Sequence, residues 1–140
     1  MSLIYTVVAR EDVLLAEFTP FSGNFVLTAQ QILKRCSPSR KYGKFSASNY
    51  IFYVLYDELI FLVMADIKYS ERIAFAFLDN IRKIFLSQHP LEATQKMGMY
   101  GAMAFSTTLR NNMELYNSPE EVDNVARLWK ETEEVNQILN

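Results

Sequence analysis

Short apolar runs separated by a polar turn open the chain and predict a β-hairpin. Residues 3–9 (LIYTVVA) and 13–18 (VLLAEF) consist mostly of aliphatic and β-branched side chains, which favour strands. Only the polar residues 10–12 (RED) separate these two runs. We therefore expect two antiparallel strands at the N-terminus.

Two stronger apolar runs follow in the middle of the chain. Residues 50–56 (YIFYVLY) and 59–65 (LIFLVMA) are separated only by Asp57 and Glu58, which predicts a second, tight hairpin. Both runs are apolar at nearly every position instead of at alternate positions. Such strands are buried on both faces, so helices should cover both sides of the sheet. A shorter strand is expected near residues 42–48.

Three segments show the three- and four-residue spacing of apolar positions that is typical of an amphipathic helix. The first covers about residues 25–36, with Asn24 as its N-cap. The second begins after an N-cap at Ser70 and runs to about Leu86, and the third lies near residues 99–116. Their apolar positions are Val26, Ala29, Leu33 and Cys36; Ile73, Phe77, Ile81 and Ile84; and Ala102, Phe105, Leu109, Met113 and Tyr116.

The C-terminal segment predicts a fourth helix of a different kind. Ser118 is a suitable N-cap, and Pro119 occupies the first helical position. Further along, a set of positions follows the rhythm of a coiled-coil seam. Spacings of three, four and three residues separate Leu128, Glu131, Val135 and Ile138. So short a seam is marginal by itself and needs partner helices or a folded surface.

The order β-β-α-β-β-β-α-α predicts an α+β fold. We expect a five-stranded, mainly antiparallel sheet with one helix on one face and two on the other, followed by a C-terminal helical tail. A length of 140 residues, half of them hydrophobic, suits a single domain with one good core.

Charge and cysteine content narrow the classes of function. The net charge of −2 argues against nucleic-acid binding, which needs a basic surface. The single cysteine excludes an internal disulfide framework and fits a reducing compartment. No window reaches the roughly 18 uninterrupted apolar residues of a membrane span, and the N-terminus lacks the basic region of a signal peptide. We therefore expect the chain to be soluble.

Residues suited to catalysis or metal binding are scarce. The one histidine, His89, follows a predicted helix in the segment 87–90 (SQHP), where we expect a solvent-exposed loop imidazole. Cys36 falls on the apolar stripe of the first helix, where a small buried hydrophobe is the commoner role. No phosphate-binding glycine motif and no cluster of metal ligands occurs. The sequence thus predicts no catalytic residue, no metal site and no cofactor.

Five cations lie within eleven residues around the expected end of the first helix. They are Lys34, Arg35, Arg40, Lys41 and Lys44. The simpler interpretation is a solvated helix end and loop, in which the charges also complement the helix C-terminus. The alternative is an anion-facing patch, directed toward lipid headgroups or an acidic helix. The chain itself contains acidic residues at Glu120, Glu121, Asp123, Glu131, Glu133 and Glu134.

Several stretches of the chain occur together in an order and at a spacing that are specific as a set. They are 2–18 (SLIYTVVAREDVLLAEF), 23–33 (GNFVLTAQQIL), 45–66 (FSASNYIFYVLYDELIFLVMAD), 72–85 (RIAFAFLDNIRKIF) and 100–125 (YGAMAFSTTLRNNMELYNSPEEVDNV). Together they resemble the N-terminal longin domain of longin-type R-SNAREs, the long vesicle-associated membrane proteins. The resemblance implies a profilin-like longin fold, which agrees with the α+β architecture expected from periodicity.

The resemblance also implies a division of the chain and a function. Residues 1–117 correspond to the longin domain, and residues 118–140 to a linker and the first turns of a truncated SNARE motif. The implied role is regulatory and non-enzymatic, in vesicle-mediated transport and membrane fusion. It places the protein on the cytosolic face of endomembranes or vesicles, held by a C-terminal anchor that is absent from this chain.

In the family, a hydrophobic groove between the first helix and the third strand binds the protein's own SNARE motif or a sorting adaptor, and the SNARE motif pairs with partner SNARE helices. The implied groove residues here are Ile32, Leu33, Cys36, Tyr42, Gly43 and Phe45. The implied SNARE layers are Leu128, Glu131, Val135 and Ile138.

Two of these positions depart from the family pattern. Gly43 stands where well-studied animal members have a large aliphatic residue, which removes about 1.5–3 kcal/mol of possible apolar burial. Tyr42 is a candidate to supply a different contact. Glu131 occupies a layer that usually holds a small or apolar residue.

Two other functions stay open from the sequence. Longin-like domains also serve as scaffold subunits of trafficking tethers or coat complexes, which lack a SNARE helix. A small-molecule-binding or catalytic α/β sandwich would instead need a concave pocket lined by convergent polar groups.

Overall fold

A single antiparallel sheet forms the centre of the protein. The computed structural model describes residues 2–118. Its five strands lie in the order β2-β1-β5-β4-β3, and every neighbouring pair is antiparallel. The strands are β1 (Leu3–Arg10), β2 (Val13–Phe18), β3 (Tyr42–Ala47), β4 (Tyr50–Asp57) and β5 (Leu59–Asp66). Both predicted hairpins are therefore confirmed, as is the shorter strand.

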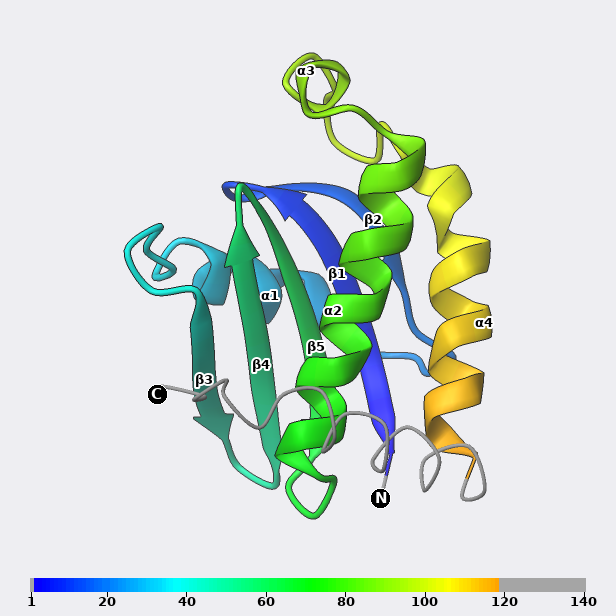
Figure 1. Cartoon of the computed structure of the whole chain (residues 1–140). Coiled ribbons are helices and arrows are strands. Elements are labelled where there is room, and N and C mark those ends of the chain that lie inside the picture. Colours follow the sequence, from blue (N-terminus) through cyan, green and yellow to red (C-terminus); the bar gives the residue numbers. More distant parts are fainter. Residues whose placement is uncertain (1, 119–140) are drawn as a thin grey trace.

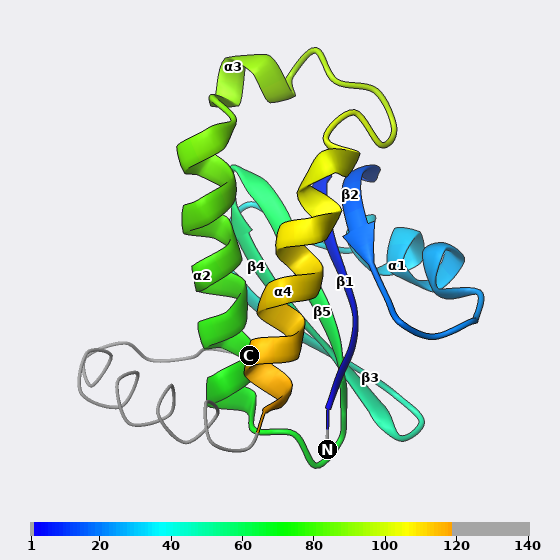
Figure 2. The same cartoon turned by 90° about the vertical axis from the view of Figure 1, so that its right-hand side faces the viewer.

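Helices cover both faces of this sheet. The helix α1 lies on one face, whereas α2 and α4 lie side by side on the other (Figures 1 and 2). The helices are α1 (Phe25–Leu33), α2 (Glu71–Gln88), the short α3 (Leu91–Thr94) and α4 (Ser106–Asn117), with a 3-10 turn η1 at Met103–Phe105. The α+β sandwich with one helix on one face and two on the other is confirmed.

The core consists of two apolar layers, one on each side of the sheet. In β5, Phe61 and Val63 belong to the layer beneath α2 and α4, whereas Ile60 and Leu62 belong to the layer beneath α1. All four side chains are almost fully buried. The continuous apolar runs in the sequence therefore reflect strands covered on both faces.

The third helix begins later than its apolar spacing predicted. Residues 99–102 form turns, and α4 starts only at Ser106. The reason is a competing use of this backbone: the N–H groups of Tyr100 and Ala102 donate to the carbonyl oxygens of Leu14 and Leu15 on the outer side of β2, at 2.7 and 3.0 Å. All five apolar positions predicted for this segment are nevertheless buried.

The first helix is shorter than predicted. It ends at Leu33, and the next three residues make tightening backbone bonds that include Arg35 N–H to the Ile32 carbonyl oxygen and Cys36 N–H to the Leu33 carbonyl oxygen. Asn24 occupies the N-cap position, but its side chain makes no capping hydrogen bond. By contrast, the Ser70 hydroxyl accepts a hydrogen bond from the Ile73 N–H and caps α2 as predicted.

The C-terminal end of α4 is fastened to the first strand. The Asn117 side chain accepts a hydrogen bond from the Leu3 N–H at 2.8 Å and donates one to the Leu3 carbonyl oxygen at 3.1 Å. It therefore pairs with β1 as a neighbouring strand would. One residue earlier, the Tyr69 hydroxyl donates to the Tyr116 carbonyl oxygen at 2.7 Å. Burial raises the pKa of Tyr69, so this hydroxyl remains a donor at neutral pH.

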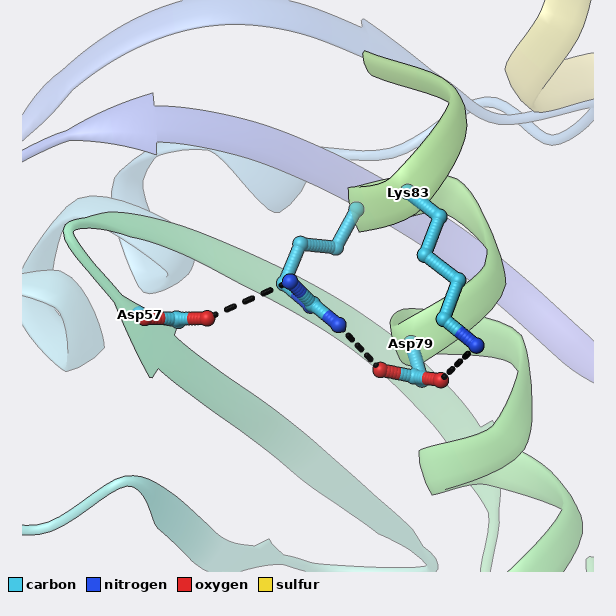
Figure 3. Close-up of polar contacts among 4 residues, drawn as sticks. Asp57, Asp79 and Lys83 are labelled. Carbon is cyan, nitrogen blue, oxygen red and sulfur yellow. Dashed lines mark hydrogen bonds and ion pairs between the residues drawn. The ribbon is translucent and has the colours of Figure 1, made fainter. Parts of the chain in front are cut away.

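An arginine connects the turn between β4 and β5 to α2 (Figure 3). This arginine is Arg82, whose two terminal nitrogens contact Asp57 at 3.3 Å and Asp79 at 2.7 Å. Lys83 contacts the second carboxylate oxygen of Asp79 at 3.1 Å. Burial by itself raises the pKa of Asp79, but the hydrogen bonds and charges of Arg82 and Lys83 outweigh it and lower this pKa below 3.8. Asp57 thus does more than form the turn.

We expect Asp79→Asn to lower the free energy of unfolding at neutral pH by about 1 kcal/mol, because charge-assisted bonds are lost at a partly exposed site. The lowered pKa means that the carboxylate stabilises the fold above pH 3.8 and that this contribution disappears as the pH falls through the folded-state pKa. Urea unfolding at a series of pH values should show the two proteins converging in acid. Glu92→Gln, on the exposed side of α3, should show no such convergence.

Candidate functional site

The three predicted groove residues on β3, Tyr42, Gly43 and Phe45, divide between its two faces. Gly43 pairs with Val54 of β4, and Phe45 belongs to the apolar layer beneath α1. Tyr42 lies on the opposite face, where its ring meets Phe75 of α2 edge-on at a centroid distance of 5.2 Å. The prediction that Tyr42 replaces the missing Gly43 side chain in the groove is therefore wrong, because neighbouring residues of a strand point to opposite faces.

A cavity of about 360 Å³ lies between the end of α1 and the strands β3 and β4. We call it the groove pocket. It is lined by Arg35, Cys36, Ser37, Ser39, Arg40, Gly43, Phe45 and Val54. Three of the predicted groove residues, Cys36, Gly43 and Phe45, are thus brought together. Apolar groups from the strands meet charged and hydroxyl groups from the loop, so the pocket can take an amphipathic ligand.

Gly43 leaves space that a side chain could occupy. A Cβ atom at this position would meet Phe45 Cε1 at 3.5 Å and Val54 Cβ at 3.6 Å, which are ordinary van der Waals distances. The backbone of Gly43 does not have a positive φ. Neither conformation nor crowding requires glycine here, so the residue contributes to the volume of the pocket.

Ile32 and Leu33, two other predicted groove residues, do not line the groove pocket. Only 7% of Ile32 and 3% of Leu33 is exposed, and both belong to the layer between α1 and the sheet. Cys36 is half-buried, and its thiol lies 3.4 Å from the Ile32 carbonyl oxygen. Burial raises the pKa of Cys36 to about 11, so the thiol stays protonated at neutral pH and acts as a small apolar group.

The cluster of five cations seen in the sequence is not one patch in space. Arg35 and Arg40 are exposed and line the groove pocket. Lys44 instead makes an ion pair of 2.7 Å with Glu71 at the start of α2, and Lys41 lies over the Tyr42 ring at 5.7 Å. The two arginines are therefore the cations that a ligand in the groove pocket would meet.

The sequence analysis did not include Val54 or the loop residues in the groove, although it named Arg35 and Arg40 as part of a possible anion-facing patch. Val54 could have been found from the register, since the β3–β4 hairpin places it opposite Gly43. The loop offered no comparable signal, because no strand or helix period fixes which way Arg35, Ser37, Ser39 and Arg40 point.

His89 differs from the expected exposed imidazole. Its ring is half-buried and stacks on Phe85 at a centroid distance of 4.3 Å, with Phe105 at 6.2 Å. His89 is the C-cap of α2, four residues after Phe85, and its ring contacts give it a packing role. Across residues 2–118, no group of three or more His, Cys, Asp or Glu side chains is placed to hold a metal ion. No helix in this range is both long and apolar enough to cross a membrane.

A second cavity of about 310 Å³ lies beside β2 and the start of α1. Its acidic group, Glu17, accepts hydrogen bonds from the hydroxyls of Tyr5 at 2.5 Å and Tyr100 at 2.8 Å. Both carboxylate oxygens thus already have a partner within the domain. This use favours a structural role for Glu17 over a role as the polar centre of a ligand site.

Comparison with known proteins places this architecture in a family. The model of the longin family, described as a regulated-SNARE-like domain, matches residues 15–109. The chain belongs to the longin family. Longin proteins of this SNARE type are non-enzymatic, which agrees with the absence of a catalytic motif in the sequence.

Relatives of this longin domain extend the match to nearly the whole chain. It is 36% identical over 140 residues to vesicle-associated membrane protein 7B of Dictyostelium discoideum, covering 99% of this chain and 54% of that protein. It is 32% identical to vesicle-associated membrane protein 714 of Arabidopsis thaliana and 27% identical to vesicle-associated membrane protein 7 of Gallus gallus, covering 99% of this chain and 64% of each. The chain thus spans roughly half to two-thirds of the length of these relatives.

The four predicted SNARE-layer residues lie outside the described residues 2–118. The proposed boundary between the longin domain and the SNARE motif, after residue 117, stays a prediction. It coincides with the last residue of α4, Asn117.

Proposed function

We propose that this chain is the regulatory longin domain of an R-SNARE in vesicle-mediated transport, and that its groove pocket binds residues 118–140 of the same chain. The observation that carries this proposal is the pocket itself, in which an apolar floor of Gly43, Phe45 and Val54 adjoins Arg35 and Arg40. A ligand for such a site needs apolar side chains next to carboxylates.

The C-terminal segment has this composition. Six acidic and two basic residues occur among residues 119–140. Of the apolar seam positions, Leu128 lies among these charges, and Val135 and Ile138 follow directly after them. An isolated helix of this length is marginal in water, so its apolar face gains from docking on a folded surface. The segment also sits on the same chain, which raises its effective concentration at the groove.

Regulation follows from competition for one apolar face. The seam that would dock in the groove pocket is the face that would pair with partner SNARE helices, so both contacts cannot form at once. Docking therefore holds the protein in a closed, fusion-incompetent state. A trafficking adaptor that fills the pocket would release the segment. In this proposal the protein acts on the cytosolic face of endomembranes or vesicles.

Hydrogen exchange on the 140-residue chain tests the docking. We expect the amides of residues 36–45 to exchange faster in the double variant Val135→Asp/Ile138→Asp than in the wild type. The reason is that two charges are placed on the docking face and oppose its burial. The control Asn136→Asp/Gln137→Glu adds the same charge at neighbouring positions and should leave the exchange unchanged. Equal exchange in all three proteins would contradict the proposal.

A substitution in the pocket tests the same contact from the other side. We expect Gly43→Leu to fill the cavity, displace the segment and increase exchange in residues 36–40, without loss of stability, since glycine is unfavourable within a strand. Gly43→Ala adds a single methyl group, so the docked segment should still protect most of the amides of residues 36–40 from exchange. If Gly43→Leu instead slows exchange, the leucine forms part of the binding wall and the pocket is not the point of insertion.

A further inference from the structure

The loop that connects α1 to β3 carries a serine–proline pair at the mouth of the groove pocket. Ser37 is exposed, precedes Pro38, and lines the pocket together with Arg35 and Arg40. Its hydroxyl oxygen lies 2.8 Å from the Ser39 hydroxyl oxygen and accepts a weak hydrogen bond of 3.3 Å from the Ser39 N–H. The hydroxyl is thus held only by exposed neighbours in the same loop.

The local backbone suits a modifying enzyme. Residues 34–40 belong to no helix or strand and make no backbone hydrogen bond to the sheet that the structure records, whereas the Lys41 carbonyl oxygen accepts one from the Tyr56 N–H. The segment 34–40 can therefore be drawn into an extended form without breaking the sheet. The proline ring disfavours the helical region for the residue before it and biases Ser37 toward an extended conformation. Ser39 lies on the same pocket but is followed by Arg40, which makes it an internal comparison.

We infer that Ser37 is a phosphorylation site for a proline-directed serine/threonine kinase, and that the phosphate controls occupancy of the groove pocket. In this step the Ser37 hydroxyl oxygen attacks the γ-phosphorus of ATP, a new O–P bond forms, and the bond to the β-phosphate oxygen breaks. ADP leaves, and a base of the kinase takes the hydroxyl proton. The kinase and ATP are the only co-reactants.

The consequence of the phosphate follows from the charges around it. A phosphoserine carries a charge of about −1.5 to −2 at neutral pH and three acceptor oxygens. Arg35 and Arg40 line the same pocket and can donate charge-assisted hydrogen bonds to it. The two arginines are then no longer available to an acidic ligand, and the phosphate repels its carboxylates. Phosphorylation should therefore favour release of the C-terminal segment, a consequence that rests on the proposed function.

The modification itself is tested first. The 140-residue protein is incubated with a proline-directed kinase and ATP, and the phosphorylated residue is mapped by mass spectrometry. Two other Ser/Thr-Pro pairs, Thr19-Pro20 and Ser118-Pro119, are scored on their own peptides. We expect a phosphate at Ser37, its loss from that peptide in Ser37→Ala and in Pro38→Ala, and its retention at Ser37 in Ser39→Ala. Pro38→Ala keeps the hydroxyl and removes only the recognition element. No phosphate at Ser37 in the wild type, or an undiminished phosphate at Ser37 in Pro38→Ala, would overturn the assignment.

The link to the pocket has a separate readout. Phosphorus NMR measures the pKa of the phosphate, which is about 6 for phosphoserine in water. We expect the two arginines to lower it by about 0.5 to 1 in the folded protein, and Arg35→Ala/Arg40→Ala to restore it. The control Lys34→Ala/Lys41→Ala removes two charges from the same loop outside the pocket. It should raise the phosphate pKa toward its value in water by less than Arg35→Ala/Arg40→Ala does. An unshifted pKa in the wild type would show that the phosphate does not engage the pocket.

Hydrogen exchange then separates this inference from the proposed function. In the phosphorylated wild type, the amides of residues 36–45 should exchange as fast as they do in Val135→Asp/Ile138→Asp. If that double variant exchanges like the unmodified protein while the phosphate pKa is lowered, the docking proposal fails and the phosphorylation site stands. If the double variant exchanges faster but phosphorylation changes nothing, the control of the pocket by Ser37 is refuted.

Discussion

Phe85→Ala should produce the largest loss of stability among single substitutions in this domain, about 3–5 kcal/mol. The Phe85 ring is fully buried and lies against the rings of Phe61, Phe105 and His89, at centroid distances of 6.3, 4.9 and 4.3 Å. Truncation would leave a cavity between α2, β5 and the 3-10 turn, where these rings cannot all move inward. Chemical denaturation followed by circular dichroism measures the change.

Leu115→Ala is the matched control for this prediction. Leu115 lies on α4 and is 41% exposed, so its truncation removes apolar atoms without opening an internal cavity. We expect its effect to stay within about 0.5 kcal/mol. Similar losses in the two variants would mean that the aromatic cluster around Phe85 does not contribute the packing energy assigned to it.

Asn117→Ala should lower the free energy of unfolding by about 2 kcal/mol, because it leaves the N–H and carbonyl groups of Leu3 without their partner. The helix end should also loosen, so amide exchange should increase at Leu3 and in the last turn of α4. Hydrogen exchange with site resolution distinguishes this local effect from global unfolding.

Two further variants define the role of Asn117. Asn117→Asp keeps an acceptor for the Leu3 N–H but cannot donate to the carbonyl oxygen, so its loss should be intermediate. Asn111→Ala changes the same residue type on the exposed side of α4 and should not destabilise the domain, since alanine favours helices. A loss in Asn117→Ala no greater than in Asn111→Ala would show that the contact with β1 contributes nothing.

The sheet and its coverage were predictable because they rest on apolar periodicity. Continuous apolar runs at 50–56 and 59–65 required burial on both faces, and the structure places helices there. The start of α4 was not predictable in this way. Its apolar positions are buried whether or not the segment is helical, and the hydrogen bonds that unwind residues 99–102 come from β2, far away in sequence.

The candidate site was only partly predictable, for two different reasons. The error at Tyr42 could have been avoided, since a residue next to Gly43 in a strand must face the other side of the sheet. The arrangement of Arg35 and Arg40 around the pocket could not be foreseen, because an irregular loop has no repeating geometry. The stacking of His89 on Phe85, by contrast, is a local contact between residues four apart at the end of α2, so it could have been predicted from the helix spacing.

The turn at residues 99–102 makes the two borders of the sheet unequal. An exposed border strand can recruit strands from other molecules, which leads to unwanted aggregation. Here the Leu14 and Leu15 carbonyl oxygens of β2 are already bonded to Tyr100 and Ala102, so an incoming strand would first have to displace that turn. Growth of the sheet by a foreign strand is thereby directed to the opposite border, β3, which carries Gly43 and Phe45. Recognition at the groove pocket and protection from aggregation would then be assigned to opposite sides of the same small domain.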